Sequence, residues 1–223
     1  MSYNIAIDGP AGAGKSTIAK LVAKKRGFIY VDTGAMYRAM ALYLLRTGVD
    51  TSDRAAIAKA CQNADISIAY QKGEQVVLLN GENVNAYLRT EEVGNMASVS
   101  SAVPEVRKKL VELQQELAAK EDVVMDGRDI GTVVLPDATV KIFLTASVEE
   151  RAMRRFRELE QRGTPESYEK VLEEMRQRDY NDSHRAAAPL KQAEDAVLLD
   201  TTELDFRQSE EAILRIIRER TSR

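Results

Sequence analysis

The 223-residue sequence contains one cysteine, one histidine and no tryptophan. Because Cys61 is alone, neither an internal disulfide nor a zinc site built from several cysteines can form. Because His184 is alone, a metal site made of several histidines is excluded, and we expect His184 itself to lie on the surface. The chemistry of this protein must therefore proceed without imidazole.

Long apolar runs and a large excess of charge of one sign are also missing. No stretch approaches the roughly 18–20 apolar residues that span a bilayer. The first residues lack the basic segment and the apolar run of a signal peptide. The formal net charge of −3 gives no general attraction for nucleic acid or an anionic membrane. We therefore expect a cytoplasmic protein with no nucleic acid and no membrane as partner, and we expect it to be a monomer.

Short apolar stretches are spaced along the chain, with helical patterns between them. They lie at residues 5–7, 28–31, 123–125, 140–144 and 196–199. Short apolar strands linked by helices are typical of a parallel sheet. In one of the connecting segments Val106, Leu110 and Leu113 recur at three- and four-residue spacing, which predicts a helix that packs on a core. The sequence thus predicts an α/β fold with five parallel strands.

One region interrupts this alternation of strands and helices. Residues 66–70 alternate large and small side chains with a period of two, and residues 76–79 form a second apolar run. Asn80-Gly81, which follows, is a strong hairpin signal. This pattern predicts a small antiparallel sheet inserted into the parallel α/β chain.

Residues 9–16 match the P-loop pattern G-x-x-x-x-G-K-[ST] completely, and they lie between an apolar strand and an amphipathic helix, as a P-loop requires. Glycines let backbone N–H groups turn toward a phosphate, and the following helix directs the positive end of its dipole to the same place. Lys15 would reach the β- and γ-phosphates of ATP, and the Ser16 hydroxyl would hold Mg²⁺. The predicted ATP-binding residues of this loop are Gly9, Pro10, Ala11, Gly12, Ala13, Gly14, Lys15, Ser16 and Thr17.

A P-loop alone does not define the reaction. A guanine-nucleotide switch is disfavoured, because the nearest match to its Asn-Lys-x-Asp signature, residues 119–122, lacks the asparagine and precedes a strand. Asp126 ends the third predicted strand, where a carboxylate could orient Mg²⁺ through water or cap the next helix. The residues alone favour neither role.

Arginines are frequent in the last third of the chain, where many alternate with glutamates. A solvent-exposed helix with i,i+4 ion pairs would explain any one of them. Phosphoryl transfer between two anionic nucleotides, however, requires several guanidinium groups to grip phosphate. The acceptor oxygen of a nucleoside monophosphate is already anionic, so this reaction needs no strong general base. A chain with one histidine and many arginines suits that chemistry.

Taken together, these motifs resemble the bacterial cytidylate kinases along nearly the whole chain. The similar segments are residues 7–16, 32–38, 89–93, 126–134, 141–147 and 178–190. The resemblance implies a P-loop NTPase fold of the nucleoside monophosphate kinase type, with a five-stranded parallel sheet flanked by helices, a small antiparallel β insert and a mobile lid. We assign residues 1–62 and 100–223 to the kinase core, with the lid near residues 150–165, and residues 63–99 to a monophosphate-binding insert.

The resemblance also implies the reaction, ATP-dependent phosphorylation of CMP or dCMP with Mg²⁺, and a role for each matching residue. Thr33, Arg107, Asp129 and Arg185 would lie near cytosine, and Ser98, Arg178 and Asp182 near the ribose. Arg38 and Arg128 would grip the acceptor phosphate, with Tyr37 also at the substrate. The lid would supply Arg151, Arg154 and Arg155. The expected catalytic residues are Lys15, Arg128, Arg151 and Arg155, and Arg154 would bind ATP.

Two other functions remain open at this point. A kinase of a small hydroxylated metabolite, of the shikimate or gluconate type, would need a carboxylate to accept the hydroxyl proton, and Asp32 is the candidate. A regulatory nucleotide-binding protein without an acceptor would need only the P-loop.

Overall fold

The structure is a computed structural model that describes residues 2–221. These residues form two compact units. Unit 1 comprises Ser2 and residues 29–123, and unit 2 comprises residues 3–28 and 124–221.

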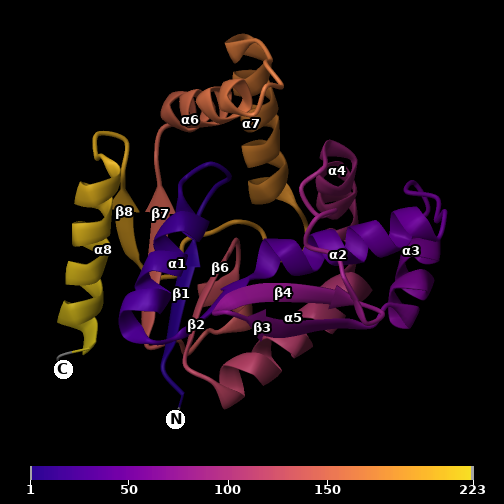
Figure 1. Cartoon of the computed structure of the whole chain (residues 1–223), viewed down its shortest axis with the longest axis horizontal. Coiled ribbons are helices and arrows are strands. Elements are labelled where there is room, and N and C mark those ends of the chain that lie inside the picture. Colours follow the sequence, from indigo (N-terminus) through magenta and orange to yellow (C-terminus); the bar gives the residue numbers. More distant parts are fainter. Residues whose placement is uncertain (1, 222–223) are drawn as a thin grey trace. The chain divides into compact units, whose positions relative to one another are not determined.

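The main sheet has five strands, in the order β2-β6-β1-β7-β8 (Figure 1). Its strands are β1 (Asn4–Asp8), β2 (Ile29–Asp32), β6 (Val123–Gly127), β7 (Val140–Thr145) and β8 (Val197–Asp200). β1 pairs in parallel with β7, and β7 with β8. The five strands predicted from the apolar stretches are thereby confirmed.

Strand burial follows position in the sheet. Ile5 and Ile7 of β1 are buried, and so are Ile142 and Leu144 of the neighbouring strand β7. Strands covered on both faces are apolar throughout, which explains why these stretches are easy to see in the sequence. β8 lies at the edge, and its Leu198 is exposed.

The helices of unit 2 lie between the strands of the sheet and after the last of them along the chain. They are α1 (Lys15–Arg26), α6 (Val148–Gln161), α7 (Tyr168–His184) and α8 (Phe206–Thr221), with a short π-helix, η2 (Ile130–Val134), after β6. α8 packs against α1 and buries Ile213 and Ile217, while α6 and α7 lie side by side (Figure 1). The P-loop leads from β1 into α1, at the carboxyl end of a strand where ligands of such sheets bind.

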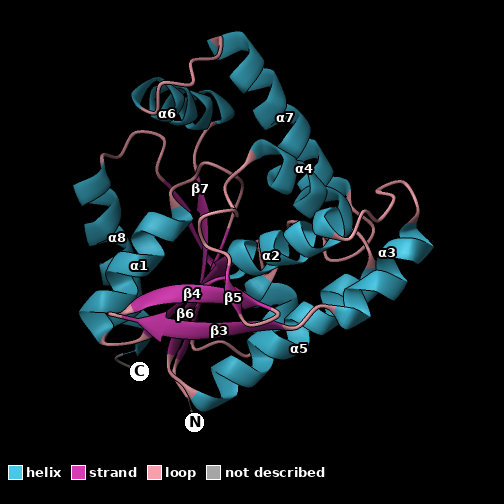
Figure 2. Cartoon of the chain, turned by 45° about the vertical axis from the view of Figure 1, so that its right-hand side comes forward, coloured by secondary structure: helices cyan, strands magenta, loops and turns pink. Residues whose placement is uncertain are grey.

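Unit 1 combines helices with the predicted antiparallel sheet (Figure 2). The sheet consists of β3 (Ile66–Gln71), β4 (Glu74–Leu79) and β5 (Glu82–Asn83). Asn80 and Gly81 join β4 to β5 with φ values of 50° and 82°, the positive values that a two-residue hairpin turn requires. The antiparallel insert is thereby confirmed.

The helices of unit 1 are α2 (Thr33–Arg46), α3 (Arg54–Ala60), α4 (Glu91–Ser100) and α5 (Pro104–Lys120), with a 3₁₀ turn, η1 (Cys61–Asn63). α2 packs against α4 and against β4. Its Met36, Met40 and Leu44 are fully buried. Within residues 2–221, no helix is both long enough and apolar enough to cross a membrane.

Candidate nucleotide-binding site

The P-loop depends on glycines at defined positions. A Cβ added to Gly9, which has φ 148°, would lie 1.9 Å from the carbonyl oxygen of Leu144, so only glycine fits where the loop leaves β1 beside β7. Gly12 and Gly14 have φ values of 74° and 86°. Left-handed conformations of this kind turn backbone N–H groups toward one side of a loop, which is how P-loops receive phosphate.

The helix that follows the loop has no side chain at its start to occupy its N–H groups. α2, α3, α4, α6 and α7 each begin with an Asp, Ser or Thr whose side chain accepts a backbone N–H. α1 begins instead after Gly14, with no such bond and no acidic residue in its first turn. The positive end of this helix is therefore suited to an external anion.

Lys15 is buried at the start of α1, with 6% of its surface exposed. Its Nζ donates a 2.6 Å hydrogen bond to the Pro10 carbonyl oxygen. Burial lowers the pKa of Lys15 well below its usual value, and nearby Arg128 lowers it further, while Asp126, Asp8 and Asp182 act in the opposite direction. An ammonium group desolvated in this way is set up to interact with a phosphate.

Ser16 lies next to Asp126, whose Oδ2 accepts a 2.9 Å hydrogen bond from the Ser16 hydroxyl. A hydroxyl and a carboxylate beside a phosphate loop are the oxygen ligands that Mg²⁺ takes when substrate phosphates complete its coordination. Within residues 2–221 no cluster of three or more His, Cys, Asp or Glu side chains could hold a metal ion by itself. The residues present therefore fit a magnesium ion that is shared with a nucleotide.

A different carboxylate, Asp8, binds the start of the helix that follows β6. Its two oxygens accept hydrogen bonds of 2.7 Å from the backbone N–H groups of Ile130 and Gly131 in η2. The helix-capping role considered for Asp126 is thus filled by Asp8. Burial raises the pKa of Asp8 to about 6, despite these two bonds and the positive charge of Lys15; the negative charge of Asp129 also raises it.

Two ion pairs extend from the end of β6 to α7 and the loop that follows it. The Nε of Arg128 donates a 2.7 Å hydrogen bond to Asp182, and Arg185 lies 3.5 Å from Asp129. Burial is the largest influence on the pKa of Asp182 and raises it, but Arg128, with Arg178 and Arg185, brings the pKa below its usual value. The structure therefore brings five predicted substrate-binding residues together in unit 2: Arg128, Asp129, Arg178, Asp182 and Arg185.

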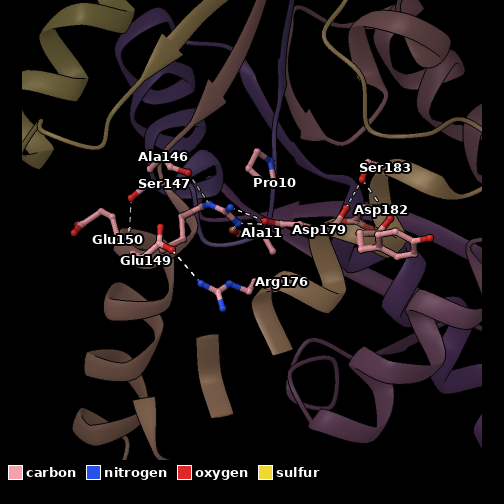
Figure 3. Close-up of polar contacts among 12 residues, drawn as sticks. Pro10, Ala11, Ala146, Ser147, Glu149, Glu150, Arg176, Asp179, Asp182 and Ser183 are labelled. Atoms are coloured by element: carbon pink, nitrogen blue, oxygen red, sulfur yellow. Dashed lines mark hydrogen bonds and ion pairs between the residues drawn. The ribbon is translucent and has the colours of Figure 1, made fainter. Parts of the chain in front are cut away.

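The three arginines predicted for the lid have different environments on α6. Arg151 is buried and donates to the carbonyl oxygens of Ala146 and Ala11 and to both carboxylate oxygens of Asp179. Arg154 is partly exposed and bonds Glu150 and the Thr201 carbonyl oxygen. Arg155 is exposed and pairs with Glu158. Figure 3 shows the partners of Arg151, which are Ala11, Ala146 and Asp179, close to one another.

Unit 1 holds the other predicted substrate-binding residues. Arg107 is buried and stacks over the ring of Tyr37, with 5.6 Å between its Cζ and the ring centroid. Thr33 is buried at the start of α2, and Ser98 is exposed on α4. The guanidinium of Arg38 is half-buried and makes no hydrogen bond or ion pair within the described residues, as a group that binds an external anion would.

Sequence analysis did not single out three residues that position this site. Asp8 binds the η2 amides, Asp179 pairs with Arg151, and the side-chain amide of Gln75 bonds both the N–H and the carbonyl oxygen of Asp32. Asp8 and Asp179 lie inside the motifs, but no pattern in the sequence reveals their contacts. His184 is exposed, as predicted, and stacks on Tyr180.

Comparison with known proteins identifies sequence relatives over nearly the whole chain. A family model described as cytidylate kinase matches residues 5–219. The chain is 52% identical over 213 residues to a protein named cytidylate kinase from Caldicellulosiruptor saccharolyticus, with 96% of this chain and 94% of that protein covered. It is 47% identical over 218 residues to a protein of the same name from Bacillus subtilis, with 98% and 97% covered.

A solved structure of an uncharacterized protein from Eubacterium ventriosum is also similar, with a TM-score of 0.51. The two chains are 12% identical, and the match covers 97% of this chain and 99% of that one. At this level of identity the similarity supports the fold alone.

Proposed function

The chain belongs to the cytidylate kinase family, as its motifs predicted, and we propose that it transfers the terminal phosphoryl group of ATP to CMP or dCMP. The products are ADP and CDP or dCDP. The observation that carries this proposal is the P-loop itself, in which an uncapped helix start, buried Lys15 and the Ser16–Asp126 pair lie together. We infer the identity of the acceptor from the relatives named cytidylate kinase.

On the ATP side, we assign phosphate binding to the backbone of residues 9–17 and to Lys15. Ser16 would hold Mg²⁺, with Asp126 orienting the water ligands of the ion. The bound ion would neutralise charge on the phosphate oxygens. Arg154 and Arg155, on α6, are assigned to ATP and to the transferring group. Arg151, which was also expected to be catalytic, contacts Ala11, Ala146 and Asp179, and we assign it to the support of the P-loop.

On the acceptor side, we assign the phosphate of CMP to Arg38 and Arg128. We assign the cytosine to Thr33, Arg107, Asp129 and Arg185, the ribose to Ser98, Arg178 and Asp182, and a further substrate contact to Tyr37. Arg38 is half-buried and its guanidinium has no partner among residues 2–221, which supports its role. An arginine that stabilises the transferring group typically contributes about 10³- to 10⁵-fold in rate.

The chemistry requires positioning and charge stabilisation more than proton transfer. An oxygen of the acceptor phosphate attacks the γ-phosphorus of ATP in line with the bond to ADP, and that bond breaks. Because the attacking oxygen is already anionic, no side chain has to remove a proton. Lys15 and the guanidinium groups stabilise the charge on the transferring group.

A metabolite kinase of the shikimate or gluconate type is disfavoured. Its candidate base, Asp32, accepts a 2.9 Å hydrogen bond from the N–H of Ala35 and so caps α2. That bond favours a structural role for the Asp32 carboxylate.

We further propose that residues 63–99 form the monophosphate-binding insert of the kinase core, that the region near residues 150–165 is its lid, and that the enzyme acts in the cytoplasm.

A coupled assay of ADP release with CMP, dCMP, UMP, AMP, GMP and shikimate as separate acceptors tests the proposal. We expect CMP and dCMP to give the highest turnover, and turnover to be lost when EDTA removes Mg²⁺. Turnover with shikimate and with no monophosphate would refute the proposal in favour of a metabolite kinase. Slow ATP hydrolysis that no acceptor changes would instead indicate a regulatory nucleotide-binding protein.

A further inference from the structure

One face of α7 contacts the phosphate loop and the end of β6 at the same time. Met175, Asp179 and Asp182 are spaced four and three residues apart, so they lie on one side of the helix. The Met175 methyl group lies 3.3 Å from the position that a Cβ on Gly12 would take. Asp179 bonds Arg151, and Asp182 bonds Arg128. This face of α7 therefore links the P-loop to a predicted acceptor-binding arginine.

Arg151 is the centre of this linkage. Its Nε donates to the Ala146 carbonyl oxygen at 2.8 Å, and its Nη1 donates to the Ala11 carbonyl oxygen at 3.0 Å. Its Nη1 and Nη2 also donate to the two oxygens of Asp179, at 2.9 and 2.6 Å. The Arg151 side chain is 5% exposed, so without Asp179 its charge would be buried with only carbonyl oxygens as partners.

The bond to Ala11 bears directly on the loop that receives phosphate. In a trans peptide the carbonyl oxygen and the following N–H point in opposite directions. Holding the Ala11 carbonyl oxygen on Arg151 therefore directs the N–H of Gly12 away from Arg151. The position of the guanidinium is in turn fixed by the two bonds to Asp179.

We propose that Asp179 is a positioning residue, which acts through Arg151 to hold the Ala11–Gly12 peptide of the P-loop in its phosphate-binding orientation. The proposal rests on the proposed function for the identity of the ligand, a nucleotide phosphate. It assigns Asp179 no contact with substrate.

The alternative is that the Arg151–Asp179 pair acts as a latch, which keeps Arg151 away from the substrate. If Arg151 had to leave Asp179 to reach the transferring phosphate, Asp179 would compete with the substrate. Removing its carboxylate would then leave nucleotide affinity unchanged or increase turnover. The two readings thus predict opposite effects of the same substitution.

The chain also offers a matched control. Glu149 and Arg176 form a second ion pair between α6 and α7, with side chains 58% and 52% exposed (Figure 3). This pair joins the same two helices as Arg151 and Asp179, but it has no bond to the P-loop among its described contacts. Glu149→Gln therefore tests the loss of an inter-helix ion pair alone.

The experiment compares Asp179→Ala, Asp179→Asn and Glu149→Gln with the wild-type enzyme. Calorimetry measures ADP binding without acceptor, and steady-state assays measure kcat and the KM values for ATP and CMP. In both Asp179 variants we expect ADP affinity and kcat/KM for ATP to fall by about tenfold or more, because one partner of a buried ion pair is removed. The KM for CMP should change less, by at most about threefold, and Glu149→Gln should stay within about twofold of the wild type throughout.

Wild-type ADP affinity in the Asp179 variants, or faster turnover, would overturn the proposal and favour the latch. Equal losses for ATP and CMP would also overturn it, because they would indicate a general structural role. If Asp179→Ala does not fold, Asp179→Asn, which keeps the size of the side chain, decides by the same criteria. Failure of the proposed function would appear separately, as wild-type enzyme that binds ADP but does not turn over CMP.

Discussion

Lys15 is buried, and burial disfavours the charged form of its ammonium group. Its Nζ bonds the Pro10 carbonyl oxygen, and burial lowers its pKa well below the usual value. An ammonium held in this way needs little reorganisation when phosphate charge develops, which is what makes such a group effective in catalysis. We expect Lys15→Ala to lower kcat for CMP by about 10²-fold or more, measured by coupled ADP release.

Lys24→Ala serves as the control for that experiment, because Lys24 is exposed near the end of the same helix. It should retain wild-type turnover. Near-normal kcat in Lys15→Ala, in a variant that melts like the wild type, would contradict the assignment of Lys15 to the transferring phosphate.

Asp8 makes the stability of the enzyme depend on pH. Burial raises its pKa to about 6 in the folded protein, against a usual value of 3.8. The folded state therefore binds this proton more tightly than the unfolded state, and the resulting stabilisation is complete below pH 3.8 and lost as the pH rises through 6. A difference of that size corresponds to roughly 3 kcal/mol.

We expect the free energy of unfolding of the wild type, relative to that of Asp8→Asn, to rise by roughly 2 kcal/mol between pH 6 and pH 4, because part of the effect lies above and below that range. Urea unfolding without nucleotide or Mg²⁺, at several pH values, measures this difference. Asp137→Asn, which removes an exposed carboxylate from unit 2, is the control. A wild-type-to-Asp8→Asn difference that is the same at every pH would show that Asp8 does not titrate in this range.

Among the larger elements, the β3–β4 hairpin supports the start of α2 through Gln75. The Oε1 of Gln75 accepts the N–H of Asp32 at 2.7 Å, and its Nε2 donates to the Asp32 carbonyl oxygen at 3.2 Å. Asp32 in turn caps α2, which carries Thr33 and Tyr37. The hairpin thus fixes the peptide from which a predicted substrate-binding helix begins.

Gln75→Leu keeps the approximate size of the side chain but removes both bonds. We expect a loss of roughly 1–3 kcal/mol in the free energy of unfolding, because the N–H of Asp32 loses its partner. The KM for CMP should rise by more than about threefold while the KM for ATP stays within about twofold, because small displacements of positioning residues weaken catalysis. Gln71→Leu, at an exposed position of β3, is the control. Loss of stability with an unchanged KM for CMP would limit Gln75 to a structural role.

The elements differ in how far the sequence predicts them. The sheet strands and the hairpin could be predicted because their apolar runs are short and end at turn residues or aspartates. α2 has no comparable signal. Met36, Ala39, Met40, Ala41 and Leu44 are all buried, so the helix lacks the polar stripe that reveals an amphipathic pattern.

The candidate site divides in the same way. The P-loop could be found from sequence because each of its residues has a local backbone or phosphate role. The supporting contacts could not. Nothing in the sequence indicates that the N–H of Ile130 donates to Asp8, which is 122 positions away. Nor does it indicate that Arg151 bonds the Ala11 carbonyl oxygen, which is 140 positions away. Such pairs are set by strand order and helix packing, which the sequence pattern does not specify residue by residue.

At the scale of the whole chain, unit 2 is interrupted by unit 1. The chain builds β1 and α1, passes through residues 29–123, and returns to unit 2 at residue 124. β1 then pairs with β7, Ile5 opposite Val140. Contacts so distant in sequence form slowly, because closing a long loop costs conformational entropy. The environment of the P-loop depends on such contacts, since Leu144 lies beside Gly9 and Arg151 bonds the Ala11 carbonyl oxygen.

The distribution of exposed apolar side chains bears on the oligomeric state, which we propose to be a monomer. Within residues 2–221 the exposed large apolar side chains are Tyr87, Val99, Val133, Tyr180, Leu198 and Phe206, each on a different helix, strand or loop. The edge strand β8 has only four residues, and short edges pair poorly with other chains. Stable homodimers bury roughly 2,000 Å² or more of mostly apolar surface, which these side chains alone do not supply. Light scattering should therefore give a mass of 24.8 kDa that is independent of concentration. A mass twice that value, persisting on dilution and reduced by Leu198→Glu, would instead identify β8 as a dimer contact.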